Sequence, residues 1–144
     1  MNAEIARNEF WNCFDKYVAD HGNKFFVTHT KAGKNQAAGN INNENPMAMQ
    51  TICCEYKYRD NLILVQVYIN RNVKLYEYLR SKREEFEQKI GERLEWVESG
   101  VKSPSVRRIQ REFYIGNKSF DKMVEIVYPY ILKFIDVFGS YIKL

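Results

Sequence analysis

The chain has 144 residues, of which 45% are hydrophobic, 15% aromatic and 28% charged, a composition that excludes an intrinsically disordered protein. This length is typical of one domain that buries roughly two thirds of its unfolded surface, so we expect a single domain over residues 1–144. The 22 basic and 18 acidic residues give a net charge of +4, which permits a polyanionic partner without requiring one.

The first third of the chain predicts a helix, a strand and a loop. Residues 3–20 carry a broad aromatic stripe at helical spacing, with charged residues largely opposite. Residues 24–30 have the composition of a strand that pairs with a later one. Residues 31–48 are rich in Gly, Asn, Ala and Lys, which predicts a mobile loop.

Residues 51–58 and 62–69 predict an antiparallel hairpin. Both stretches alternate with a period of two and are separated by a short turn. The alternation places Cys54 and Tyr56 on one face of the first strand, and Glu55 and Lys57 on the other.

Residues 72–91 predict one long helix packed on the sheet. Its apolar residues recur at spacings of three, four and seven and are Val73, Tyr76, Leu79, Phe86 and Ile90. We expect Phe86 to lie mid-helix against the sheet, and Gly91 to end the helix in the left-handed conformation. The charged positions predict a solvated face with the pairs Glu85–Lys89 and Arg83–Glu87.

The rest of the chain predicts a second hairpin and a helix. Residues 94–98 and 106–115 read as strands, and residues 117–144 as a helical region. Because proline lacks a backbone donor, Pro129 predicts either a kink or two helices that meet near Tyr128. The whole order predicts an α+β fold: a mostly antiparallel sheet packed by an N-terminal helix, a long central helix and a kinked C-terminal helix.

The run LYEYLRSKREEFEQKIGERLEW at residues 75–96 resembles the bacterial domain of unknown function 4268 family, here as a stand-alone member. The Phe10–Trp11 pair of the first helix, the Gly- and Asn-rich middle segment and the aromatic C-terminal helix extend the resemblance over nearly the whole chain. The family has no assigned activity. Its members occur alone or behind nuclease domains of the restriction type, which implies a role in DNA handling or in defence against foreign DNA.

The N-terminus and the cysteines indicate a cytoplasmic protein. The first ten residues lack the charged and apolar regions of a signal peptide, and no apolar run approaches the roughly eighteen residues of a membrane helix, so we expect no membrane partner. Three cysteines are an odd number, and the adjacent Cys53 and Cys54 point to opposite faces of a strand, which argues against a disulfide framework.

Glu55 and Lys57 are the candidate catalytic residues. Residues i and i+2 of a strand share a face, so the carboxylate could bind a divalent metal while the ammonium offsets charge on a phosphate, as in nucleases of the restriction type. The partner Asp that such nucleases place on a preceding strand is missing upstream. An ordinary solvated strand face is the competing interpretation.

Lys102, Arg107, Arg108 and Arg111 are the candidate nucleic-acid-binding residues. They form the densest basic cluster of the chain and could contact a phosphate backbone from a β-ribbon. The competing interpretation is pairing of one subset with the acidic residues Glu95, Glu98 or Glu112.

We therefore expect a non-catalytic binding or accessory module with no resident cofactor, linked to DNA processing or defence, whose partner is nucleic acid or protein. The first alternative is a metal-dependent nuclease built on Glu55 and Lys57, which alone would need a divalent metal. The second alternative is an oligomeric scaffold, with a homodimer as its simplest form.

Overall fold

A computed structural model describes residues 2–22, 26–29, 36–40, 50–98 and 105–142 of the chain. The elements are, in order, α1 Ala3–Asp20, β1 Phe26–His29, β2 Gln36–Asn40, β3 Gln50–Lys57, β4 Leu62–Asn70, α2 Val73–Ser81, α3 Arg83–Ile90, β5 Glu95–Val97, β6 Val106–Tyr114, α4 Phe120–Phe138 and the 3₁₀ helix η1 Gly139–Tyr141.

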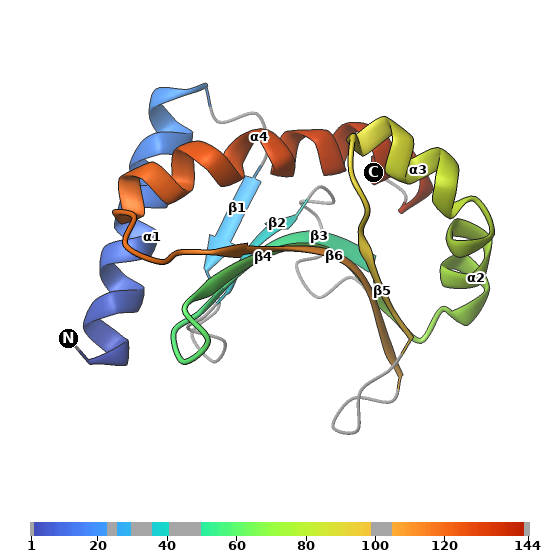
Figure 1. Cartoon of the computed structure of the whole chain (residues 1–144), viewed down its shortest axis with the longest axis horizontal. Coiled ribbons are helices and arrows are strands. Elements are labelled where there is room, and N and C mark those ends of the chain that lie inside the picture. Colours follow the sequence, from blue (N-terminus) through green and yellow to red (C-terminus); the bar gives the residue numbers. More distant parts are fainter. Residues whose placement is uncertain (1, 23–25, 30–35, 41–49, 99–104, 143–144) are drawn as a thin grey trace.

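The strands form one antiparallel sheet in the order β1-β2-β3-β4-β6-β5. Figure 1 shows α4 and α3 running over one face of this sheet, with α1 at one end and α2 at the other. The predicted α+β fold, the helix over residues 3–20 and both hairpins are confirmed. The face turned away from α4 is called the open face below.

The core lies between α4 and the sheet. On β4 the side chains toward α4 are fully buried, and they are Ile63, Val65, Val67 and Ile69. Phe10 of α1 closes one end of this core, where its ring stacks on Tyr56 of β3 with 4.9 Å between centroids. The β4 side chains that point to the open face are buried too, since Leu64 is 1% and Gln66 0% exposed. β4 is therefore the central strand, as its continuous apolar run indicates.

The prediction of one long central helix is wrong, because the helix breaks at Lys82 into α2 and α3. The Ser81 hydroxyl donates to the Tyr78 carbonyl at 2.6 Å, a local bond that competes with the helical ladder. The break turns α3 from the sheet toward α4, so that Phe86 packs on Phe138 with 4.9 Å between ring centroids. Phe86 is thus fully buried as expected, but against the C-terminal helix.

The end of α3 matches its sequence signal. Gly91 has φ 99°, in the left-handed region, and its N–H donates to the Glu87 carbonyl at 2.8 Å. Glycine takes this conformation without the penalty that a Cβ atom imposes. The chain is thereby released into the connection that leads to β5.

Pro129 does not divide the C-terminal helix, since α4 continues from Phe120 to Phe138. Of the two outcomes expected near Tyr128, separate helices are not found. Pro129 and Glu125, four residues before it, are both exposed, so water can satisfy the carbonyl that the proline leaves unbonded.

In the described part of the chain, no helix is long and apolar enough to cross a membrane.

The prediction of one loop over residues 31–48 is wrong for Gln36–Asn40, which is strand β2 between β1 and β3. Small residues made this stretch look like a loop, but the Ala37 and Ala38 backbones pair in register with Cys54 and Cys53. Backbone pairing does not require the β-branched residues by which strands are recognised. The remaining residues of the predicted loop lie outside the described residues.

Candidate functional site

Glu55 and Lys57 share the open face of the sheet, as predicted, because they pair in register with Leu64 and Leu62 of β4. A hollow of about 320 Å³ lies at this end of the β3–β4 hairpin. We call it the turn hollow; its lining residues are Arg7, Glu55, Lys57, Tyr58, Arg59 and Asp60.

The turn hollow contains a second carboxylate, that of Asp60, which sequence reasoning missed because it sought an acid upstream of Glu55. The Asn61 backbone at φ 52° reverses the chain here, and its carbonyl accepts from the Ile115 N–H at 3.0 Å. Asparagine tolerates this left-handed conformation better than most residues. With these lining residues the hollow could bind a cation through the carboxylates of Glu55 and Asp60. It could instead bind an anion through its three basic side chains.

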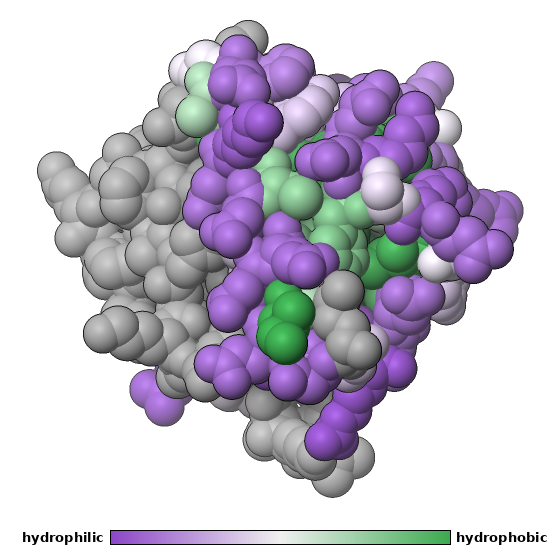
Figure 2. Space-filling view, turned by 90° about the vertical axis from the view of Figure 1, so that its left-hand side faces the viewer, coloured by the Kyte–Doolittle hydropathy of each residue, from purple (hydrophilic) through white to green (hydrophobic). Residues whose placement is uncertain are grey.

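Figure 2 shows the side of the molecule at this end, where hydrophilic side chains cover most of the described surface and apolar surface appears only between them. Among the residues that the structure describes, no three His, Cys, Asp or Glu side chains are grouped to hold a metal ion. The local surface therefore suits a charged or polar ligand.

The structure divides the three described members of the predicted nucleic-acid-binding set between two faces of the sheet. Arg107 and Arg111 lie on the α4 side of β6, opposite Ile69 and Val65, whereas Arg108 lies on the open face. Lys102 lies outside the described residues.

Arg111 is half-buried and makes contacts within the fold. Its Nε donates to Glu92 Oε2 at 2.5 Å, and its guanidinium carbon lies 4.2 Å from the centroid of the Phe113 ring. The predicted pairing of one arginine with an acid is therefore found, but the acid is Glu92 and not Glu95, Glu98 or Glu112. The negative charge of Glu92 makes such an arginine a weaker phosphate ligand than one without a carboxylate partner.

Arg107 and Arg108 face different surroundings. Arg108 is half-buried, with its guanidinium carbon 5.8 Å from the centroid of the Tyr68 ring. Arg107 lies near Tyr76: burial raises the pKa of that tyrosine, and the positive charges of Arg80 and Arg107 oppose the increase.

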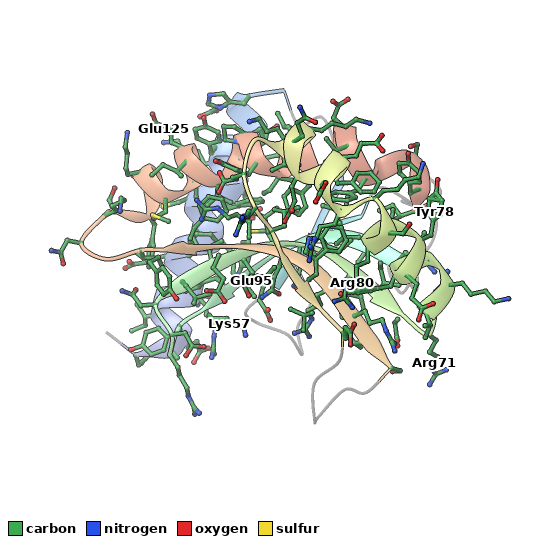
Figure 3. All side chains as sticks on the ribbon, turned by 45° about the vertical axis from the view of Figure 1, so that its right-hand side comes forward. Lys57, Arg71, Tyr78, Arg80, Glu95 and Glu125 are labelled. Carbon is green, nitrogen blue, oxygen red and sulfur yellow. The ribbon has the colours of Figure 1, made fainter. Side chains whose placement is uncertain are left out.

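A second charged surface, with three basic and two acidic side chains, surrounds the break between α2 and α3. A hollow of about 540 Å³ is lined there by Arg80, Ser81, Lys82, Arg83, Glu84 and Glu85, and we call it the elbow hollow. Figure 3 shows Arg80 and Tyr78 at this end of the molecule and Lys57 at the opposite end of the sheet. The two hollows are thus separate sites.

The cations of the elbow hollow differ in their pairing. Arg80 forms an ion pair with Glu98, and Lys82 lies over the Tyr78 ring with 5.2 Å to its centroid. Hydrogen bonding and charge interaction with that tyrosine raise the pKa of Lys82, which keeps it charged. Arg83 makes no ion pair with any described carboxylate.

A third hollow, of about 370 Å³, adjoins the elbow hollow because both are lined by Arg83 and Glu84. We call it the indole hollow; its other lining residues are Glu87, Arg93, Leu94 and Trp96. The predicted pair Glu85–Lys89 is present at 3.5 Å. The prediction of an ion pair between Arg83 and Glu87 is wrong, because the two side chains do not pair.

Glu87 turns instead toward the strand that follows α3. Its Oε2 accepts from the Leu94 N–H at 2.7 Å and from Trp96 Nε1 at 3.2 Å. Helical spacing alone paired Glu87 with Arg83, because the contact with β5 arises only from the tertiary fold. As a result Arg83 and Arg93 both face the hollow without a carboxylate partner among the described residues.

A family model described as "Domain of unknown function (DUF4268)" matches residues 6–142, which include all the elements from β1 to η1 and most of α1. No curated protein and no solved structure shows significant similarity to the chain.

Proposed function

The chain belongs to the DUF4268 family, whose model covers nearly its whole length, and from this premise we propose that it is a nucleic-acid-binding accessory module in DNA processing or in defence against foreign DNA. The observation that supports the proposal is the surface formed by the adjoining elbow and indole hollows, which are lined by four basic and three acidic side chains. Its cations without a described carboxylate partner are Lys82, Arg83 and Arg93, and we call these three residues the elbow cations.

The elbow cations suit a phosphate backbone better than the β6 arginines do. They are exposed. Of the nearby acids, Glu85 pairs with Lys89 and Glu87 bonds to the β5 segment, whereas the exposed Glu84 lines both hollows. Three phosphate contacts release about three counterions, so we expect affinity to fall roughly 40-fold between about 50 and 200 mM salt. Contacts of this kind do not depend on base sequence.

The test is a fluorescence anisotropy titration of labelled DNA at those two salt concentrations. The test variant combines Lys82→Gln, Arg83→Gln and Arg93→Gln. The matched control combines Lys16→Gln, Lys118→Gln and Lys122→Gln, which removes the same charge from exposed positions on and near α1 and α4. We expect the test variant to lose most of its affinity and its salt dependence, and the control to keep both. Equal losses in the two variants would contradict the assignment to the elbow cations.

Asp60 lines the same hollow as Glu55 and Lys57, which favours a second candidate function, that of a metal-dependent nuclease at the turn hollow. Two carboxylates could hold a divalent ion while Lys57 stabilises charge on the phosphate. The test is cleavage of plasmid and single-stranded DNA with Mg²⁺ or Mn²⁺. Cleavage that Glu55→Gln and Asp60→Asn both abolish would support this function. A complete lack of cleavage, or cleavage that survives both substitutions, would remove it.

We place the module in the cytoplasm. Cys13, Cys53 and Cys54 are free thiols, and the last two are buried. Unpaired thiols are stable in a reducing compartment, which supports this placement.

A further inference from the structure

We infer that the indole hollow binds one unpaired base of a single-stranded nucleic acid, with the base against Trp96 and the adjacent phosphates against Arg83 and Arg93. This inference rests on the proposed nucleic-acid binding and adds the class of strand that the surface prefers.

Trp96 is held in one orientation. It pairs in register with Ile109 of β6, and the Tyr76 ring of α2 lies on one side of it at 6.3 Å with an interplanar angle of 29°. The indole N–H donates to Glu87. Trp96 is half-buried and lines the hollow, so we infer that the part of its ring not covered by Tyr76 serves as an aromatic platform there. Successive bases of a single strand bind such platforms by stacking.

The charged groups around this platform match a nucleotide. Arg83 comes from α3 and Arg93 from the connection to β5, and both guanidinium groups lack an ion-pair partner within the described part of the chain. A guanidinium group forms paired hydrogen bonds with phosphate oxygens. The Glu84 carboxylate can accept from an exocyclic amino group, as carboxylates do from cytosine. Glu87 also lines the hollow and keeps its charge, with its Oε2 directed to the Leu94 N–H and to Trp96 Nε1.

The size of the hollow favours a single strand over a duplex. Its volume of about 370 Å³ is at the lower end of the range for small-ligand sites, enough for one nucleotide. In a duplex the faces of a base are covered by its stacked neighbours. Only an unpaired base can therefore place its face on Trp96.

The test uses Trp96 as its own reporter. The chain has two tryptophans, and the other, Trp11, is 7% exposed in α1. In a Trp11→Phe background we would titrate single-stranded oligo(dC), and separately a duplex of the same length, at low salt. We expect the single strand to quench Trp96 fluorescence with the affinity seen by anisotropy, and the duplex to leave it unchanged.

Two variants complete the test. Trp96→Leu should weaken single-strand binding roughly tenfold or more, the loss typical of one stacked base, and leave duplex binding unchanged. Arg93→Gln keeps the indole in place and should weaken both strand types through their phosphates, so the Trp96 fluorescence titration decides the matter if Trp96→Leu does not fold.

The outcomes separate this inference from the proposed function. Constant Trp96 fluorescence at saturating oligo(dC), together with salt-dependent binding that the elbow-cation variant loses, overturns the inference alone. Binding that survives loss of the elbow cations overturns the proposed function and this inference with it.

Discussion

Arg111 of β6 and Glu92 of the α3–β5 connection are joined by a hydrogen bond of 2.5 Å between Nε and Oε2. The Tyr130 hydroxyl of α4 donates to the other oxygen of Glu92, and the Tyr130 ring lies 5.6 Å from the Arg111 guanidinium carbon. One carboxylate thus connects the sheet to α4. A residue in the densest basic cluster of the sequence therefore has a structural role.

Arg111→Leu should lower the free energy of unfolding by roughly 1–2 kcal/mol, because a half-buried carboxylate loses a charged partner. Its affinity for DNA should stay within experimental error of the unsubstituted protein. Urea denaturation and anisotropy titration measure the two quantities. A large loss of affinity in a fully folded variant would return Arg111 to the binding surface.

The same contact makes stability depend on pH. Burial raises the pKa of Glu92, but hydrogen bonds from Tyr130 and Arg111 and the charge of Arg111 outweigh burial and hold the pKa below its ordinary value. The stabilisation is therefore complete above the ordinary value and is lost as pH falls through the lowered one. As the pH is lowered from about 5 to about 3, the free energy of unfolding of Glu92→Gln should fall less than that of the unsubstituted protein. Chemical denaturation at each pH measures both. The same pH dependence of unfolding free energy in both proteins would contradict this role of Glu92.

Phe86→Ala should cost roughly 3–5 kcal/mol, because the ring is fully buried and leaves a cavity between α3 and α4. The control is Tyr114→Ser, since Tyr114 is 66% exposed and its removal should change stability by less than about 0.5 kcal/mol. Urea denaturation measures both. A cost below about 1 kcal/mol for Phe86→Ala would mean that α3 is poorly packed on α4.

Gly91→Ala should destabilise the protein by roughly 1–2 kcal/mol, because the residue has φ 99° although no atom obstructs a Cβ there. The cost is therefore one of backbone conformation and not of crowding. Gly91→Asn should cost less, since asparagine adopts the left-handed region more readily. Thermal melts of the two variants test this order, and the reverse order would exclude the conformational explanation.

The three cysteines should react slowly with a thiol reagent in the folded protein. Burial raises the pKa of Cys53 to about 12, and burial together with a hydrogen bond to Asp121 raises that of Cys13 to about 11. Burial also raises the pKa of Cys54. The thiolate is the reactive form, so the cysteines should react slowly with a chromogenic disulfide reagent at pH 8 until denaturant is added. A fast phase in native buffer would show that one thiol is accessible and ionised.

The periodicity of the sequence was sufficient for most of the fold. Apolar residues at helical spacing delimited α1, and alternation placed Glu55 and Lys57 on the face away from Tyr56. Gly91 marked the end of α3. These are local signals, because each depends on residues a few positions apart.

The functional surfaces were harder to predict, because they depend on contacts between distant residues. The apolar spacing around Lys82 does not distinguish a helix break from a continuous helix. The Ser81 hydroxyl, which can bond to the backbone, was only a weak local signal of the break. Asp60 joins Glu55 only when the hairpin closes. Arg93 and Trp96 approach Arg83 only when β5 returns beside α3.

The sequence by itself determined the α+β class, the paired strands and the family, because hydrophobic periodicity and glycine positions act over short distances along the chain. The tertiary structure alone decided which charges are available. Arg111 and Arg83 are equally basic in the sequence, yet the fold brings a carboxylate to the first and turns Glu87 away from the second. A charge binds a ligand only where folding leaves it without a closer partner, and that depends on through-space distances that no local pattern contains.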